Sequence, residues 1–99
     1  IISKQNITGI TEMDENRLKA LGDALCFQLG IYKKTDPGLS YNICFYSAPK
    51  EYRKSKYFRF YEQLIPRKGN MAGFEFSTGC YINSVLPTEF EKRIKEVMK

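Results

Sequence analysis

The sequence of 99 residues contains no histidine, no tryptophan and only three cysteines. Histidine is the side chain that most often serves as a general base near neutral pH and as a transition-metal ligand, so its absence excludes the commonest forms of both sites. No Cys-x-x-Cys pair is present, and a zinc site would need carboxylates and isolated thiols. No Ser, Cys or Lys stands beside a recognisable base. We therefore expect no catalytic residue, no metal and no cofactor in this chain.

The chain also lacks long apolar runs. None approaches the ~20 residues that cross a bilayer, and no secretory signal is visible. The cysteines, Cys26, Cys44 and Cys80, are widely spaced among apolar residues, which favours buried reduced thiols over a disulfide. These features predict a cytoplasmic protein with no membrane partner.

Positive charge is in excess and lies in one half of the sequence. Residues 1–49 hold five basic and five acidic side chains, whereas residues 50–99 hold eleven and six, which gives the net charge of +5. This excess favours an anionic partner such as a nucleotide, a sugar phosphate or nucleic acid. The length corresponds to one domain with a modest core, because such a chain buries only about two-thirds of its unfolded surface. Since the chain begins Ile1-Ile2 and not with Met, we expect it to be part of a longer protein.

Two helices are predicted from apolar side chains that recur at steps of three and four residues. The first runs from about Glu12 to Lys33, with Thr11 as its N-cap and Asp14 three residues later, as in a capping box. The second is short and starts at Pro87, a residue favoured in the first helical turn. The apolar face of the long helix consists of Leu18, Leu21, Leu25, Leu29 and Tyr32.

Two strands are predicted between these helices. Residues 41–48 are apolar on both faces, as in a central strand. Residues 57–65 alternate, because successive side chains of a strand point to opposite faces. The face toward the long helix has Phe58, Phe60 and Leu64, with Glu62 as an unexplained exception, and the other face has Arg59, Tyr61, Gln63 and Ile65. We expect Pro66 to end this strand.

The stretch from Met71 to Val85 predicts a β-hairpin. Two β-prone halves flank Ser77-Thr78-Gly79, a three-residue loop with glycine at its left-handed position. In a strand, Glu75 would face away from the rings of Phe74 and Phe76, and Gly73 would let a ligand or another backbone come close. From these residues alone, an ordinary hairpin and a ligand-binding loop are equal alternatives.

A basic loop at residues 50–56 supports a different function. Lysines and arginines interleaved with aromatic rings can bind RNA or single-stranded DNA, although such loops are more often solvated turns. A non-catalytic nucleotide- or RNA-binding module that uses the basic Lys50–Arg59 loop is therefore the alternative function. Nucleic acid is the less favoured partner.

Two ordered blocks carry a resemblance to a known family. Tyr41-Asn-Ile-Cys-Phe-Tyr-Ser-Ala-Pro49 is similar to a Y-N-x-x-x-H-T-A-P strand. Asn70–Asn83, with Pro66-Arg67 before it and Pro87 after it, is similar to an A/G-G-F-E-x-G/S-T-G-x-Y-I-N-P segment. Both of these patterns are found in the C-terminal half of the galactose-1-phosphate uridylyltransferase family, in the histidine-triad (HIT-like) superfamily. Gln63 and the Thr78–Asn83 run most resemble the ADP-glucose phosphorylase branch.

The resemblance implies an α+β fold, with an HIT-like antiparallel sheet, one long helix packed on one face and a short C-terminal helix. Residues 1–99 would form a single HIT-like domain, the C-terminal part of a longer chain. The implied function is the sugar-phosphate-binding half of a hexose-1-phosphate nucleotidylyltransferase, of the UDP-glucose–hexose-1-phosphate uridylyltransferase or ADP-glucose phosphorylase type. The family's histidine nucleophile lies in its N-terminal half, so this chain alone is not expected to be catalytic.

The resemblance also implies a binding site and partners. Hexose 1-phosphate and a nucleotide sugar are the expected ligands, and the missing N-terminal half or a second subunit of a homodimer is the expected protein partner. The residues that would cup the sugar are Asn70, Ala72, Phe74 and Glu75. Gly73, Thr78 and Gly79 lie beside them, Arg67 is placed to meet a phosphate, and Gln63 completes the set.

One departure from the family concerns a structural metal. Many members bind it through a histidine at the position of Tyr46 and through the two ligands of a His-x-His/Glu strand, at the positions of Tyr61 and Gln63. Another histidine commonly stands at the position of Arg59. Neither Tyr nor Gln is a good zinc ligand in this setting. The chain would then represent either a metal-free branch, in which Gln63 makes a hydrogen bond instead, or a copy that has lost catalysis.

Overall fold

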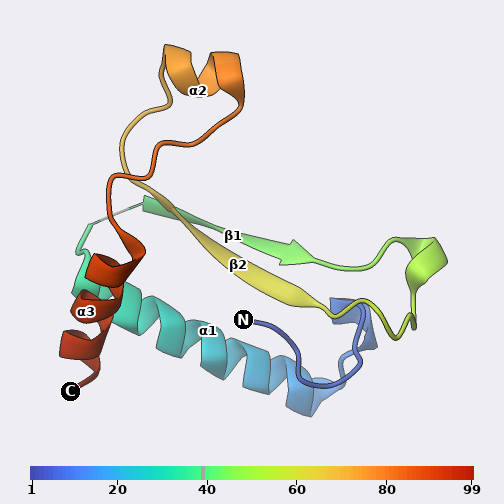
Figure 1. The fold of residues 1–99 in the computed structure, drawn as a ribbon. Coiled ribbons are helices and arrows are strands. Elements are labelled where there is room, and N and C mark those ends of the chain that lie inside the picture. The colour runs from blue at the N-terminus through green and yellow to red at the C-terminus, as the bar shows by residue number, and fades with distance from the viewer. Residues whose placement is uncertain (39) are drawn as a thin grey trace.

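The computed structural model describes residues 1–38 and 40–99. Strands β1 (Ser40–Tyr46) and β2 (Tyr61–Arg67) form a two-stranded antiparallel sheet, and helix α1 (Glu15–Thr35) lies below it (Figure 1). Helix α3 (Pro87–Met98) packs against the C-terminal end of α1. Single 3₁₀ turns occur at η1 (Ile10–Glu12) and η2 (Lys50–Tyr52), and a short helix, α2 (Gly73–Thr78), precedes α3. The predicted α+β class, with one long helix and a short C-terminal helix, is confirmed.

The register of the sheet decides which side chains face the helices. Pairing runs from Ser40–Arg67 to Tyr46–Tyr61. Tyr41 meets Tyr32 of α1 edge-on, with ring centroids 6.0 Å apart. Alternation therefore places Ile43 and Leu64, whose side chains share a face of the sheet with that of Tyr41, on the α1 side. The opposite side, called the open face below, is covered by no helix within residues 1–38 and 40–99. It carries Asn42, Cys44, Tyr46, Tyr61, Gln63 and Ile65.

The hydrophobic core is small. Its most buried side chain is Phe60, 2 % exposed, which stacks on Phe45 with centroids 6.1 Å apart. The predicted leucine face of α1 is only half covered, and Leu18 is 45 % exposed. The radius of gyration is 16.2 Å, whereas a compact domain of this length has about 13 Å. Much apolar surface therefore stays uncovered.

The start of the long helix differs from the prediction, because Glu12 has another task. The Thr8 hydroxyl donates to Oε1 of Glu12 at 2.5 Å, and the Thr8 N–H donates to Oε2 at 3.2 Å. Lys54 N–H in turn donates to the Thr8 hydroxyl at 3.2 Å. These bonds hold residues 10–12 in a 3₁₀ turn. Asp14, and not Thr11, is the N-cap of α1 and accepts from Arg17 N–H at 2.9 Å.

Glu12 makes the stability of this junction dependent on pH. The hydrogen bonds from Thr8, helped by Lys54 and Arg53, lower the pKa of Glu12 below its usual value. A carboxyl group with a lowered folded-state pKa stabilises the protein above its unfolded pKa, and this stabilisation is lost as the pH falls through the folded pKa. Glu12→Gln is therefore expected to reduce the difference between the urea midpoints at pH 7 and at pH 3. Equal pH dependence in both proteins would contradict this role.

Both strands are shifted from their predicted bounds by the N-terminal segment. Phe60 N–H donates to Ile7 C=O at 2.7 Å, and Ala48 N–H donates to Thr8 C=O at 2.7 Å. These bonds take residues 47–60 out of the β1–β2 ladder. Glu62, the exception in the predicted pattern, is only 3 % exposed, and its backbone N–H and C=O both bond to Ile1.

The prediction that Pro66 ends its strand is wrong, because Pro66 lies inside β2. The backbone groups of Glu62 point to Ile1, away from β1. Backbone groups of alternate residues in a strand point to the same side. The backbone of Pro66, four residues after Glu62, therefore also faces away from β1. A proline is tolerated there, since no N–H is needed on that side.

The predicted hairpin is wrong, and a helix takes the place of its first strand. Ala72 N–H donates to Oε2 of Glu75 at 3.0 Å, which caps the first turn of α2. The hydroxyls of Ser77 and Thr78 donate to Phe74 C=O at 3.1 and 2.7 Å. Gly79 does adopt the expected left-handed conformation, with φ of 69°, but it ends a helix instead of closing a hairpin. Residues 79–86 contain no strand.

The cysteines are free, as predicted, but their expected burial is wrong. Cys26 and Cys80 are exposed, and Cys44 is half-buried. In the part of the chain that the structure describes, no helix combines the length and the apolar content needed to cross a membrane.

Candidate functional site

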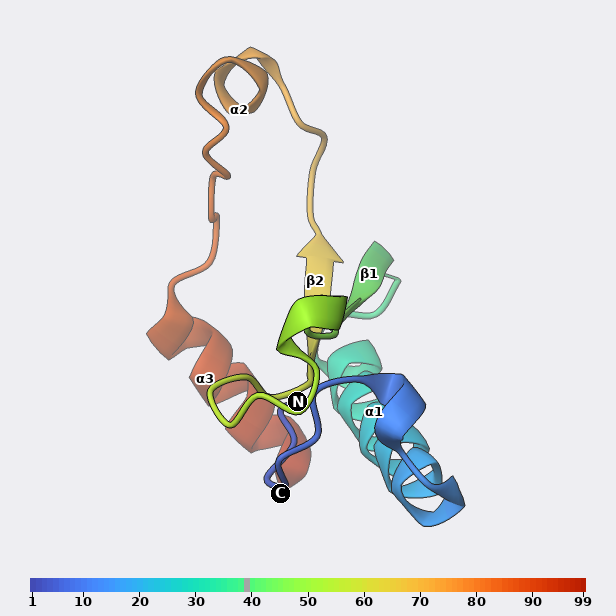
Figure 2. The same ribbon diagram turned by 90° about the vertical axis from the view of Figure 1, so that its right-hand side faces the viewer.

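Residues 68–86, called the arm below, leave the end of β2 and return at the start of α3. Figures 1 and 2 show from two directions that the arm, with α2 at its tip, stands away from the sheet and from helices α1 and α3. Six of its apolar side chains are between 46 and 81 % exposed: Met71, Phe74, Phe76, Tyr81, Ile82 and Leu86. A cluster of this kind, exposed on one segment, is typical of a surface that another body covers.

Most of the predicted site residues lie on this arm. The exceptions are Gln63 and Arg67, which belong to β2. Glu75 is half-buried, and the remaining predicted residues on the arm are exposed. These remaining residues are Asn70, Ala72, Gly73, Phe74, Thr78 and Gly79.

The chemistry available at the tip of the arm is a carboxylate whose two neighbours in the sequence are phenylalanines. One oxygen of Glu75 caps α2, and the other makes no hydrogen bond within the described residues. Phe74 and Phe76, on either side, are 55 and 73 % exposed. No Cβ at Gly73 would meet another atom within 4 Å, so a ligand could approach the backbone there. Such a tip can accept hydrogen bonds from hydroxyl groups and present an apolar wall.

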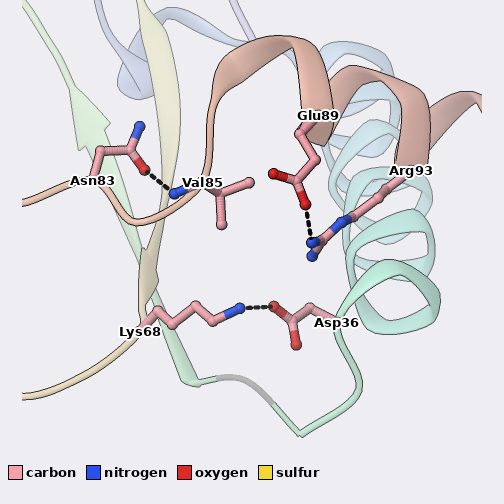
Figure 3. Close-up of polar contacts among 6 residues, drawn as sticks. All are labelled: Asp36, Lys68, Asn83, Val85, Glu89 and Arg93. Atoms are coloured by element: carbon pink, nitrogen blue, oxygen red, sulfur yellow. Dashed lines mark hydrogen bonds and ion pairs between the residues drawn. The ribbon is translucent and has the colours of Figure 1, made fainter.

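The base of the arm is fixed by contacts that the sequence analysis missed (Figure 3). Lys68 Nζ lies 3.3 Å from Oδ2 of Asp36, just after α1, and this ion pair holds the outgoing end. On the returning end, Asn83 Oδ1 accepts from Val85 N–H at 3.2 Å. This side-chain turn precedes Pro87, and an asparagine shortly before a helix-starting proline was the available signal.

The residues that flank the arm line one groove. Pro66, just before the arm, and Phe90, just after it, both line a groove of about 300 Å³ between α1, β2 and α3. Tyr32 of α1 lies in its wall, and burial together with nearby Asp36 raises the pKa of its phenol. The groove therefore lies at the base of the arm and is lined mostly by apolar side chains.

The positions that the resemblance assigns to a structural metal form a second cluster, on the open face. Tyr46 and Tyr61 are directly opposite each other, with rings stacked at 4.4 Å and an interplanar angle of 10°. The Tyr46 hydroxyl donates to Oε1 of Gln63 at 3.1 Å. Desolvation, together with neighbouring Cys44 and Tyr61, raises the pKa of the Tyr46 phenol.

These side chains do not fit a metal ion. Neutral phenols and an amide are poor zinc ligands, and here they contact each other. Within residues 1–38 and 40–99, no group of three or more His, Cys, Asp or Glu side chains is placed to hold a metal. The hydrogen bond predicted for Gln63 is present.

Three residues of the basic loop make contacts within the chain. Arg59 Nη1 donates to Lys4 C=O, and Lys54, at a positive φ of 64°, donates its N–H to Thr8. Lys56 Nζ lies 5.1 Å from the ring centroid of Tyr57, which uses that ring for a cation–π contact. The side chains of Lys50, Tyr52 and Arg53 in the same loop are exposed.

Comparison with known proteins supports the resemblance. No family model matches the chain, and no solved structure matches it. ADP-glucose phosphorylase of Arabidopsis thaliana is 30 % identical over 99 residues, which cover 98 % of this chain. The chain spans 28 % of the length of that relative. This similarity supports the resemblance to the galactose-1-phosphate uridylyltransferase family at the level of the family.

Proposed function

We propose that residues 1–99 form one HIT-like domain, the C-terminal part of a longer chain. In this proposal the domain is the hexose-1-phosphate-binding half of a nucleotidylyltransferase of the ADP-glucose phosphorylase type. The observation that carries the proposal is the similarity to ADP-glucose phosphorylase, which extends over nearly the whole chain and includes the tip of the arm. The substrates would be a hexose 1-phosphate and a nucleotide sugar.

The geometry of the arm supports the sugar-binding role. A carboxylate can accept two sugar hydroxyls, and hydrogen bonds to a charged acceptor are roughly twice as strong as neutral ones. Glu75 has one oxygen free for this purpose, and the ring of Phe74, the preceding residue, is exposed. Asn70 and the backbone at Gly73 lie on the same segment, and exposed Arg67 at the base of the arm offers a cation for a phosphate.

The arm cannot enclose a sugar alone, because it stands free on both sides. A covering body is therefore part of the proposal, either the N-terminal half of the longer chain or a second subunit of a homodimer. That body would also supply the nucleophile, since this chain has no histidine.

Glu75→Ala, made in the longer enzyme, is expected to reduce sugar-phosphate turnover while binding of the nucleotide portion changes little. Each lost hydrogen bond to the charged carboxylate costs roughly 1.5–3 kcal/mol, which corresponds to about 10- to 100-fold in rate. Turnover and nucleotide binding are measured on the same preparations. Glu75→Gln keeps an acceptor for the Ala72 N–H, so a loss shared by both variants reports the charge and not the cap.

The matched control for this experiment is Ser77→Ala. It removes a hydrogen bond to Phe74 C=O in the same short helix but leaves the proposed sugar contacts in place. It should retain turnover. Full turnover in Glu75→Ala would refute the sugar-binding role. If the chain is instead an RNA-binding module, Lys54→Ala with Lys56→Ala will abolish RNA binding, and Glu75→Ala will leave it intact.

A further inference from the structure

The groove between α1, β2 and α3 has the size and lining of a small-molecule site. Its β2 wall consists of Leu64 and Pro66, and its α3 wall of Phe90 and Ile94. Among the described side chains that line it, none is charged. Its volume is about 300 Å³, whereas an apolar cavity of ~150 Å³ already holds benzene. The groove therefore has room for a ligand of about two rings and is too small for a strand or helix of another protein.

Two polar atoms in the α1 wall of the groove lack hydrogen-bond partners. They are the hydroxyl of Tyr32 and Oε1 of Gln28, both buried and without a partner in residues 1–38 and 40–99. Tyr32 is only 6 % exposed. By contrast, the Thr35 hydroxyl in the same wall donates to Ile31 C=O at 2.9 Å. Buried polar groups are rarely left without a partner, so these two atoms indicate a partner from outside the chain.

The chemistry of the two atoms specifies the group that would satisfy both. Gln28 and Tyr32 are four residues apart on α1, so their side chains are neighbours on one face of the helix. The amide oxygen of Gln28 can only accept a hydrogen bond, whereas the phenol of Tyr32 can donate one. Burial, together with nearby Asp36, raises the pKa of the Tyr32 phenol, so it keeps its proton at neutral pH. One ligand hydroxyl can donate to the first atom and accept from the second.

We propose that this groove binds an uncharged aromatic alcohol of about two rings, with its hydroxyl between Gln28 Oε1 and the Tyr32 hydroxyl. The rings of the ligand contact Leu64, Phe90 and Ile94. Phosphates and carboxylates are excluded, because burying a charge without a partner is costly. The site therefore shares neither residues nor ligand chemistry with the proposed sugar site on the arm, and it is tested independently of that site.

The first test uses 2-naphthol as the probe ligand. It is titrated into the 99-residue chain, and saturable NMR chemical-shift changes are expected at Leu64, Phe90 and Ile94. The matched ligand is 2-naphthoate, which has the same rings but an anionic group in place of the hydroxyl. It should bind at least about tenfold more weakly. Equal binding of the two ligands would contradict the proposal, because the groove would then recognise the rings alone.

The second test removes each polar atom in turn. Tyr32→Phe and Gln28→Leu are each expected to raise the dissociation constant of 2-naphthol about fivefold, the effect of one lost hydrogen bond. Neither should lower the urea midpoint of the free chain, since an apolar group costs less to bury than a polar group without a partner. Tyr57→Phe is the matched control, because Tyr57 is 87 % exposed and does not line the groove. It should change neither quantity.

Three outcomes would overturn the proposal. The first is the absence of saturable 2-naphthol binding to the wild-type chain. The second is equal affinity in the wild type and in both variants, because the ligand would then occupy another apolar surface. The third is a lower urea midpoint in Tyr32→Phe, which would show that the hydroxyl already has a partner in the free protein, such as an ordered water.

Discussion

Phe60→Ala is expected to lower the free energy of unfolding by about 3–5 kcal/mol, the usual loss for a fully buried phenylalanine. Phe60 is 2 % exposed and stacks on Phe45, and its backbone bonds to Ser3 and Ile7 join the N-terminal segment to the sheet. A domain of this size has only about 5–15 kcal/mol in total. The variant should therefore be partly unfolded at room temperature in urea titrations followed by circular dichroism.

The control for Phe60→Ala is Phe76→Ala, the same substitution on the arm. Phe76 is 73 % exposed, so its loss should change the free energy of unfolding by no more than about 0.5 kcal/mol. A cost below about 1 kcal/mol at Phe60 would show that the small core is not where the stability resides.

The second large effect concerns the open face. The wild-type chain is expected to carry no stoichiometric zinc or iron. The combined variant Tyr46→His, Tyr61→His and Gln63→His is expected to bind zinc. Opposed residues on antiparallel strands have Cβ atoms ~4.5–5.5 Å apart, and Tyr46 and Tyr61 are such a pair, with Gln63 on the same face. Three imidazoles suit the tetrahedral geometry of zinc. At a zinc concentration 100 times the dissociation constant, the variant should gain about 2.7 kcal/mol of stability.

This experiment is read by elemental analysis and by thermal unfolding with and without a chelator. The matched control keeps Tyr61→His and Gln63→His but carries Tyr46→Phe, which removes one ligand and should weaken zinc binding at least about tenfold. A wild-type chain that retains about one metal ion after chelation would contradict the assignment of these residues as a metal-free cluster.

Elements governed by local chemistry were the predictable ones. Helix α3 begins at Pro87 as expected, because its apolar stripe and its first residue both favour a helix there. The pairing of the two strands was also anticipated, and alternation correctly separated Phe60 and Leu64 from Tyr61 and Gln63. The ends of α1 and of both strands were misplaced, because Thr8 and Ile7 bind residues far along the chain. No local pattern in the sequence predicts such long-range hydrogen bonds.

The arm shows why the site was harder to predict than the fold. Its sequence contains β-prone residues on both sides of Ser77-Thr78-Gly79, and the same three residues can close a hairpin or end a helix. In the structure the Glu75 carboxylate caps the Ala72 N–H, which favours the helix. Gly79 has a positive φ in either case, so that feature alone could not distinguish the two structures. The resemblance located the segment but did not give its conformation.

The arm has a consequence for how this chain can change over evolutionary time. It closes a loop of ~20 residues, and the entropic cost of such a closure rises by only about 0.6 kcal/mol for each doubling of length. The ion pair between Lys68 and Asp36 and the packing of α3 against α1 position its base independently of what lies between. Insertions, deletions and exchanges of apolar side chains in the arm therefore cost the sheet and helices little. In the proposed complex, selection on the sequence of the arm comes from the body that covers it.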